Sequence, residues 1–370
     1  MARIDLDAIR HNIRTIRDLV APAAVMAVVK ADAYGHGAVP VARAALEAGA
    51  TWLGTAHVSE ALALRAAGLD APLLAWLHTP STDFAAALGA DIDLGVSGWE
   101  LDPVIAAARA TGRGARIHLK IDTGLGRNGC PPADWDRVVG QAAQAQAEGH
   151  VKVVGIWSHL AVADEPQRPE TDEQLAVFTD ALERAERLGV VPELRHLANS
   201  PGLLSRADLR FDLVRCGLAM YGLNPFEDDT PVPELRPAMR LSTRIASAKR
   251  VPAGQGVSYG LRWRAETGTV LGLVPLGYAD GIPRIAEDAP VLINGRVYRG
   301  VGRIAMDQFV VDLGPDADPA EFLGAEAVLF GGAGEPPVEE WAAAAGTINY
   351  EIVTRISQRV PRVWTGESHD

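Results

Sequence analysis

One pattern repeats eight times between Val25 and about Gly217: a short apolar run followed by a longer amphipathic segment rich in Ala and Leu. The runs begin near Val25, Thr51, Pro72, Asp91, Ala115, Val151, Glu193 and Arg210. Buried parallel strands are almost continuously apolar, because helices cover both faces of their sheet. Eight strand–helix units in a row predict a closed (β/α)8 barrel, with helices expected at Val39–Ala48, Ser59–Ala67 and Asp172–Leu188.

The pattern changes after Pro225. A polar, proline-rich joint at 228–233 precedes Val- and Gly-rich runs separated by turn signals. Strands are expected at Val270–Pro275 and Val310–Leu313, a hairpin around Asn294-Gly295, and a helix at Val338–Gly346. A chain of 370 residues exceeds the size of one core. We therefore expect an α/β fold with a TIM barrel domain at 1–231 and a C-terminal mainly-β domain at 232–370.

The overall charge limits the classes of partner. With 35 basic and 47 acidic residues, the net charge of −12 repels nucleic acid and anionic lipid surfaces. No apolar run reaches the length of a membrane span, and the acidic start does not resemble a signal peptide, so we expect a cytoplasmic protein. Two cysteines, Cys130 and Cys216, are too few for a disulfide framework and wrongly spaced for zinc, so we expect no metal.

Polar residues collect where the apolar runs end. Active sites of (β/α)8 barrels form at the C-terminal ends of the strands. A single lysine at such an end often only extends its amine to water, but here many polar groups converge, and a helix that follows could hold an anion at its N-terminus. The sequence therefore predicts a site at this end of the barrel, built from Lys30, Tyr34, Lys120, Arg127, Ser158, His159, His196, Asn199, Ser200 and Arg215.

These segments resemble the alanine racemase family over nearly the whole chain. The run VVKADAYGHG at 28–37 matches the family's attachment motif for pyridoxal 5′-phosphate (PLP), a highly specific pattern. Other matches occur in the same order along the chain, at 4–12, 122–127, 199–200, 215–222, 257–260, 277–281, 306–308 and 349–351. The resemblance implies a PLP-dependent isomerase that interconverts L-alanine and D-alanine and supplies D-alanine for peptidoglycan.

The resemblance also implies a two-base mechanism in a homodimer. Lys30 would hold PLP covalently and serve as the base on one face of the substrate, and Tyr259 of the other subunit would be the base on the opposite face. A hydrogen-bonded chain would lead from Tyr259 through His159 to Arg215. Arg215 would face the pyridine nitrogen, and because arginine keeps its charge, we expect it to limit transamination.

Further roles carry over residue by residue. Arg127 would contact both PLP and the substrate carboxylate, Tyr278 and Met306 would orient that carboxylate, and Asp307 would support the site. Lys120 matches a lysine that is often carbamylated in the family. The implied cofactor-binding residues are Lys30, Tyr34, Arg127, His159, Asn199, Ser200, Arg215, Gly217, Leu218 and Tyr350.

Two departures and two other functions stay open. Cys216 stands where many relatives have proline, and Ala305 where cysteine is common, so the choice between alanine and serine as substrate is not decided. A fold-related PLP decarboxylase of basic amino acids is disfavoured by Arg215, because such enzymes use an acid at that point. A silent PLP-binding regulatory protein is disfavoured by the intact pair Lys30 and Tyr259.

Overall fold

The eight apolar runs form one parallel sheet in the computed structural model, which describes residues 1–366. Its strand order is β8-β7-β6-β5-β4-β3-β2-β9. Backbone hydrogen bonds from Asp212 N to Arg195 O (3.1 Å) and from Arg215 N to Ala198 O (3.0 Å) join β8 to β9 and close the ring. The predicted barrel is confirmed. Its strands are β2 (Ala24–Val28), β3 (Trp52–Thr55), β4 (Leu73–Ala75), β5 (Asp93–Val96), β6 (Ala115–Lys120), β7 (Val151–Trp157), β8 (Leu194–His196) and β9 (Leu213–Cys216).

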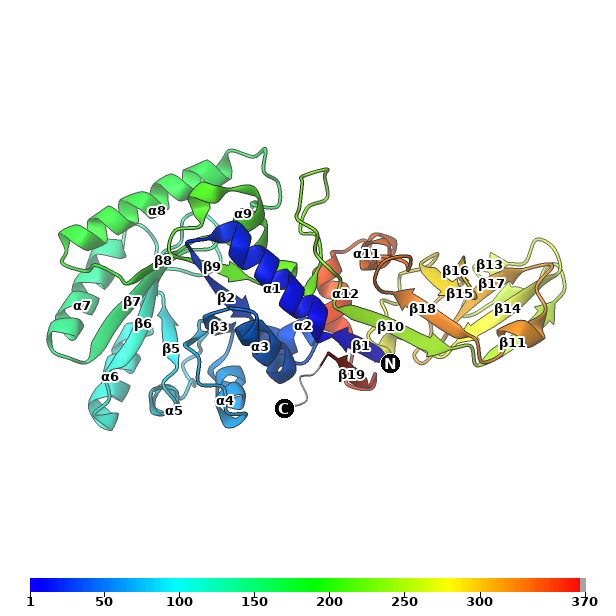
Figure 1. Cartoon of the computed structure of the whole chain (residues 1–370), viewed down its shortest axis with the longest axis horizontal. Helices are drawn as coiled ribbons and strands as arrows, with labels where there is room; N and C mark the ends of the chain where they lie inside the picture. Colours follow the sequence, from blue (N-terminus) through cyan, green and yellow to red (C-terminus); the bar gives the residue numbers. More distant parts are fainter. Residues whose placement is uncertain (367–370) are drawn as a thin grey trace. The chain divides into compact units, whose positions relative to one another are not determined.

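Helices lie on the outer face of this barrel (Figure 1). The three helices expected from sequence are confirmed as α3, α4 and α8, with ends that shift by one or two residues. In α8, the buried Phe178, Ala181 and Ala185 recur at helical spacing and face the strands. The helices are α1 (Leu6–Val20), α2 (Lys30–Gly35), α3 (Ala38–Glu47), α4 (Val58–Ala66), α5 (Phe84–Gly89), α6 (Leu101–Thr111), α7 (Trp135–Ala147), α8 (Glu170–Arg187), α9 (Ser200–Ser205), and the 3₁₀ turns η1 (Ala207–Leu209) and η2 (Leu218–Tyr221).

The second unit is built on a nine-stranded sheet of order β11-β14-β17-β16-β15-β18-β10-β1-β19. The expected hairpin joins β15 to β16 through Asn294 and Gly295, whose φ angles of 48° and 77° suit a two-residue turn. Its elements are β1 (Ala2–Asp5), β10 (Met239–Arg244), β11 (Ser247–Val251), β12 (Gly256–Val257), β13 (Trp263–Arg264), β14 (Thr269–Val274), η3 (Tyr278–Asp280), β15 (Pro290–Ile293), β16 (Arg296–Val301), β17 (Phe309–Gly314), α10 (Pro319–Phe322), β18 (Glu326–Phe330), α11 (Val338–Ala345), α12 (Asn349–Arg355) and β19 (Arg362–Thr365).

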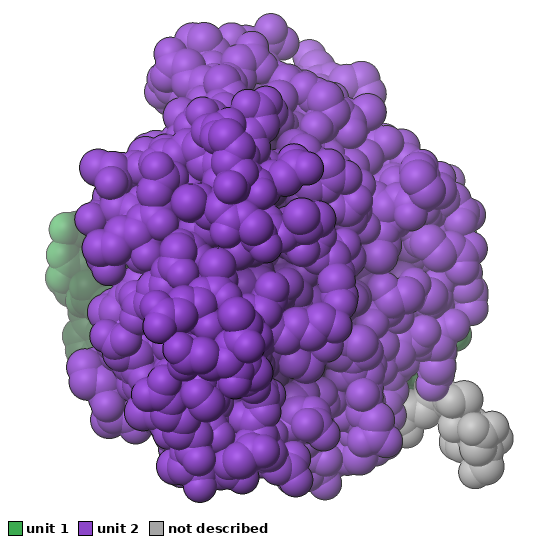
Figure 2. Space-filling view, turned by 90° about the vertical axis from the view of Figure 1, so that its left-hand side faces the viewer, with its two compact units in different colours: residues 1–8, 34–37, 236–370 green, residues 9–33, 38–235 purple. Residues whose placement is uncertain are grey.

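The division between the units differs from the expected boundary at 231/232. The barrel unit comprises Ile9–Ala33 and Ala38–Leu235, and the β unit comprises Met1–Ala8, Tyr34–Gly37 and the chain from Arg236 onward (Figure 2). The first residues belong to the β unit because β1 pairs with β10 and β19. Such long-range backbone pairing leaves no local signal in the sequence.

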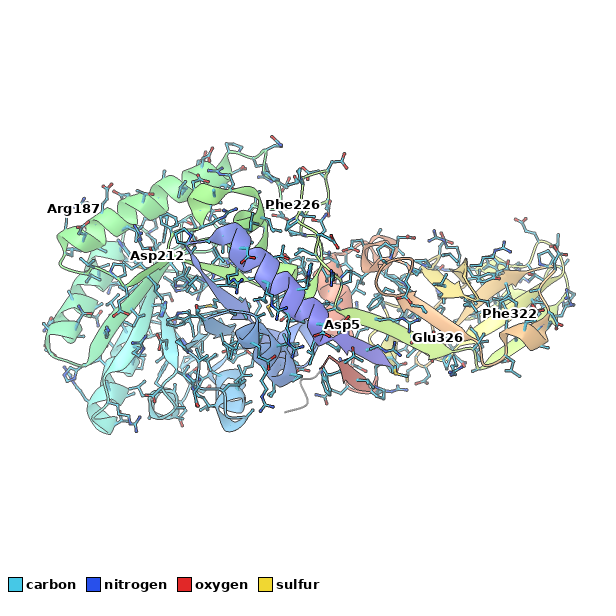
Figure 3. All side chains as sticks on the ribbon, viewed as in Figure 1. Asp5, Arg187, Asp212, Phe226, Phe322 and Glu326 are labelled. Carbon is cyan, nitrogen blue, oxygen red and sulfur yellow. The ribbon has the colours of Figure 1, made fainter. Side chains whose placement is uncertain are left out.

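Apolar side chains from several strands form a core of the barrel unit. Met26, Trp52, Leu74, Val154 and Leu213 form a buried cluster. Directly before β9, Asp212 (labelled in Figure 3) accepts hydrogen bonds from the amide and guanidinium of Arg195, at 2.8 and 2.7 Å, and so links the last two strands.

Across residues 1–366, no helix combines the length and the apolar character needed to cross a membrane.

Candidate active site

Lys30 follows β2 and begins a short turn of unusual handedness. The next four residues, 31–34, have φ angles of 52–53°, in the left-handed helical region. Each such L-residue is destabilised by roughly 1–2 kcal/mol, so other contacts must hold the turn. Glu60 accepts a hydrogen bond from the Ala31 amide (2.7 Å), and Asp32 accepts one from the first amide of α3 (2.8 Å). The carboxylate of Asp32 thus binds the first amide of α3, one of the N-terminal amides that an anion could contact.

Four cationic side chains lie near one another at the C-terminal ends of the barrel strands, namely Lys30, Lys120, Arg127 and Arg215. Burial and the charges of Arg127 and Arg215 lower the pKa of Lys30. Burial, Arg215 and Arg127 likewise lower the pKa of Lys120, to about 7. The Lys120 amine donates to Asn128 Oδ1 (2.8 Å) and lies 4.5 Å from the centre of a Trp157 ring. The cluster therefore favours an anionic ligand and contains amines that lose their protons readily.

Arg215 is held by carbonyl oxygens and by two histidine rings. Its guanidinium donates to the carbonyls of Ser158 (2.7 Å), His196 (2.9 Å) and Leu197 (3.0 Å). It also lies 3.2 Å from His196 Nδ1 and 3.3 Å from His159 Nδ1. Burial lowers the pKa of Arg215 to about 9, which leaves the guanidinium protonated at neutral pH. The group is thus a fixed positive charge that only donates hydrogen bonds.

His159 is neutral in this surrounding. Burial, followed by the charges of Arg215, Arg127 and the two lysines, lowers the pKa of His159 well below its usual value. Because Arg215 donates to Nδ1, the ring proton of His159 is on Nε2. One link of the expected chain, His159 to Arg215, is therefore present in the barrel unit.

The residues after β8 and β9 form a second part of the site. Ser200 Oγ accepts hydrogen bonds from the amides of Gly217 (3.1 Å) and Ala219 (3.2 Å). The amide of Leu218 lies between these two in the chain. The side chain of Asn199 caps α9 by accepting from the Gly202 amide (3.1 Å), so the structure gives it a local structural role.

Several expected site residues belong to the β unit. The rings of Tyr34 and Tyr350 lie 6.1 Å apart, which brings together two of the implied cofactor-binding residues. Tyr278 N donates to Ala305 O (3.1 Å), and the neighbouring amide of residue 279 donates to Met306 O (3.0 Å). These bonds hold Tyr278 beside Met306, and their side chains are 38% and 52% exposed.

Tyr259 projects from a turn of the β unit and is 67% exposed. Ser258, with a φ of 58°, anchors this turn through a hydrogen bond from its hydroxyl to Arg303 O. Asp307 is paired with Arg359 at 2.9 Å on the surface of the same unit. The structure thus presents Tyr259, Tyr278 and Met306 as exposed side chains on the β unit.

Sequence reasoning missed four residues that shape the barrel site. Asn128 binds the Lys120 amine, and Glu60 supports the turn after Lys30. Trp157 stacks on His196, with ring centres 5.4 Å apart and planes at 6°. His118 reaches His196 from the middle of β6. A histidine within an otherwise apolar run was the one available signal for the last of these.

The chain is similar to known proteins along nearly its whole length. The family model described as "Alanine racemase, N-terminal domain" matches residues 4–225, and the one described as "Alanine racemase, C-terminal domain" matches 238–364. The chain is 55% identical to a Thermobifida fusca protein named alanine racemase, over 99% of this chain and 98% of that one. It is also similar to the solved alanine racemase structures from Streptomyces coelicolor (TM-score 0.96, 55% identity, 99% and 98% coverage) and Streptomyces lavendulae (TM-score 0.94, 57% identity, 99% and 97% coverage).

Proposed function

The chain belongs to the alanine racemase family of isomerases, and from that premise we propose that it interconverts L- and D-alanine with PLP held by Lys30. The same proposal includes a two-base mechanism, a homodimer with shared sites, and supply of D-alanine for peptidoglycan. The observation that carries it is the cluster of Lys30, Arg127 and Arg215 around neutral His159 at the end of the barrel where such enzymes react.

The residues present fit PLP by their chemistry. An amine whose pKa is lowered by burial and by neighbouring cations is suited to bond an aldehyde, because only the neutral amine is a nucleophile. The surrounding cations match an anionic phosphate and phenolate. Ser200 and the amides after β9 offer hydrogen bonds to a phosphate, which would share or replace the bond between Gly217 and Ser200. When bound, PLP makes the Cα–H bond of an attached amino acid acidic by withdrawing electrons.

The two bases act on opposite sides of that carbon. The neutral amine of Lys30 takes or returns the proton on one face, and the phenol of Tyr259 does so on the other. A free tyrosine has a pKa of about 10, so as a base it needs a neighbour that favours the phenolate. With its proton on Nε2 and Arg215 at Nδ1, His159 can donate a hydrogen bond to the phenolate oxygen of Tyr259, and we propose that this bond stabilises the basic form of the tyrosine.

A second copy of the chain is proposed to supply Tyr259. Three large residues of the β unit stay exposed: Tyr259 at 67%, Tyr278 at 38% and Met306 at 52%. Exposed apolar groups of this size favour burial against a partner. The proposed partner surface is the active-site end of the other subunit's barrel.

Arg215 is proposed to restrain the side reaction of transamination. A guanidinium at the pyridine nitrogen does not give up its proton readily, so negative charge stays nearer Cα, where reprotonation regenerates an amino acid. An Arg215→Glu variant should form pyruvate from alanine at a measurably higher rate relative to racemisation. Unchanged partitioning between the two products would contradict this role.

Lys120 is proposed as a site of carbamylation. Its pKa of about 7 leaves a substantial neutral fraction that can react with CO₂. The product is an anion that could pair with Arg127 and would relieve the repulsion among the cations. Asn128 could then change from acceptor to donor by turning its amide, since both ends of an amide can bond.

We propose that alanine is the preferred substrate, and serine is the amino acid against which this preference should be measured. Cys216 is fully buried, so its thiol packs within the protein. Ala305 removes side-chain volume beside Met306. A difference of one or two atoms changes discrimination by only about 1–3 kcal/mol, and kinetics with both enantiomers of alanine and serine measure it directly.

The cofactor assignment is tested with Lys30→Ala. We expect loss of the long-wavelength absorbance that PLP gives when bonded to an amine, together with loss of racemisation of L-alanine. Lys152→Ala is the matched control, because Lys152 is 55% exposed and pairs with Glu193. Retained absorbance or turnover in Lys30→Ala would exclude Lys30 as the attachment site.

The shared site is tested by mixing two variants that should each be inactive, Lys30→Ala and Tyr259→Phe. If each site combines Lys30 of one subunit with Tyr259 of the other, a mixed dimer has one intact site, and random exchange should restore about a quarter of wild-type activity. If both bases come from one chain, no mixed dimer has an intact site. Failure to recover activity in demonstrably mixed dimers would refute the sharing.

A further inference from the structure

A line of polar side chains continues from Arg215 through the barrel interior. His196 Nδ1 lies 3.2 Å from Arg215 Nη1, and His196 Nε2 lies 3.0 Å from His118 Nδ1. His118 Nε2 lies 3.2 Å from Asp93 Oδ2, and Asp93 Oδ1 accepts from Arg116 Nε at 2.8 Å. The exposed fraction is 0% for both histidines and 2% for Asp93. The line thus joins the active-site end of the barrel to its opposite rim, where the side chain of Arg116 is 40% exposed.

The contacts define where each ring proton must be. Arg215 can only donate, so His196 Nδ1 must accept and the proton of His196 is on Nε2. That proton points to His118 Nδ1, which must also accept, so the proton of His118 is on its own Nε2. Asp93 then accepts it as a carboxylate. If His118 carried two protons, its Nδ1–H would face the Nε2–H of His196, and one contact would be lost.

Packing prevents the rings from turning away. A Cβ atom on Gly155 would lie 2.2 Å from His118 Nδ1, so only glycine leaves room for that ring. Trp157 stacks on His196 at 5.4 Å, and the edge of Trp52 meets His118 at 5.4 Å. Burial, followed by the charge of Arg215, lowers the pKa of His196 well below its usual value, in agreement with a neutral ring.

We propose that His118 is a positioning residue for the racemase reaction: together with Asp93 it sets the tautomer of His196 and thereby the hydrogen bonding and orientation of Arg215. The functional part rests on the role of Arg215 given under Proposed function. A reversed His196 tautomer would place an N–H against the guanidinium, which would have to move away from its position among the three carbonyls.

Asp93→Asn tests the direction of the hydrogen bonds along this line of side chains. An amide has one accepting and one donating end, whereas both ends of the carboxylate accept here. With its oxygen toward Arg116, the new amide would donate to His118 Nε2, which moves the His118 proton to Nδ1 and reverses His196 in turn. In the double variant Asp93→Asn/Arg116→Met the amide is free to turn its oxygen toward His118. Arg116→Met alone is the matched control.

The measurement is ¹⁵N NMR of the holoenzyme labelled in its histidine rings, with signals assigned by single His→Gln substitutions. We expect neutral Nε2–H tautomers for His118 and His196 in the wild type and in Arg116→Met, reversal in Asp93→Asn, and recovery in the double variant. In parallel, kcat should fall roughly 10–100-fold in Asp93→Asn, the range found when the hydrogen-bond partners of metal-binding histidines are replaced, with a smaller change in KM and recovery in the double variant.

Three outcomes would overturn the proposal. Wild-type rings that are doubly protonated or carry the proton on Nδ1 would do so even if Asp93→Asn did not fold. Unchanged tautomers in a folded Asp93→Asn protein, or reversed tautomers with unchanged kcat, would do so as well. The ring spectra need no turnover, so failure of racemase activity in the wild type would contradict the proposed function and leave the tautomer result standing.

Discussion

The buried charge of Lys120 should contribute to the pH dependence of the stability of the cofactor-free protein, and Lys120→Met should remove that contribution. The residue is 5% exposed, and its pKa falls from the ordinary 10.5 to about 7, chiefly by burial and then by the charges of Arg215 and Arg127. Between those two pH values the unfolded chain holds more protons than the folded one. The free energy of unfolding therefore rises with pH in this window.

The magnitude follows from the same two pKa values. Each pKa unit corresponds to about 1.4 kcal/mol, so keeping Lys120 folded costs about 5 kcal/mol at pH 6 and about 2 kcal/mol at pH 9. Methionine has a similar length and no charge, and loss of the bond to Asn128 offsets about 1 kcal/mol. Lys120→Met should thus stabilise the protein by about 4 kcal/mol at pH 6 and about 1 kcal/mol at pH 9.

Urea unfolding at both pH values, in buffer depleted of CO₂, measures the effect. Lys152→Met is the control, since that exposed lysine should change stability by no more than about 0.5 kcal/mol at either pH. Added bicarbonate should stabilise the wild type and leave Lys120→Met unchanged if the carbamate forms. An equal gain at pH 6 and pH 9 would refute a buried, charged Lys120.

Two further substitutions test local features of the fold by urea unfolding. In Gly277→Ala, the new Cβ would lie 2.3 Å from the carbonyl oxygens of Ala305 and Met306, so we expect the free energy of unfolding to fall by about 3 kcal/mol. Gly332 faces open space, so Gly332→Ala should change it by no more than about 0.5 kcal/mol. Similar losses in both variants would contradict the close approach at Gly277. Asn199→Ala should cost about 1 kcal/mol by removing the cap of α9. Unchanged stability combined with weaker PLP binding would instead make Asn199 a cofactor contact.

The barrel and its site end were accessible from sequence because their signals are local. Each strand lies in a short run that is mostly apolar, and most runs are followed by the polar residues that the strand end exposes. This pattern predicts that Lys30, Lys120, His159 and Arg215 lie at one end of the barrel, and the structure connects them through shared charge and hydrogen bonds. The hairpin at Asn294-Gly295 was equally local.

Other features depend on residues that are distant in the chain. The assignment of β1 to the β unit needs its pairing with β10, more than 230 positions away. The capping of α3 by Asp32 depends on a left-handed turn that no motif indicated. The line from Asp93 through His118 to His196 joins three strands, and its ring protons follow only from the contacts between them.

The sequence by itself determined the family, the order of strands and helices, and which residue types meet at the barrel end, because these follow from periodicity and from motifs read along the chain. The tertiary structure alone decided how charge is distributed there: a lysine with a pKa of about 7, a neutral His159, and a guanidinium held by three carbonyls and two rings. Burial and electrostatic coupling depend on distances in space, and residues far apart in sequence set those distances only once the barrel has closed.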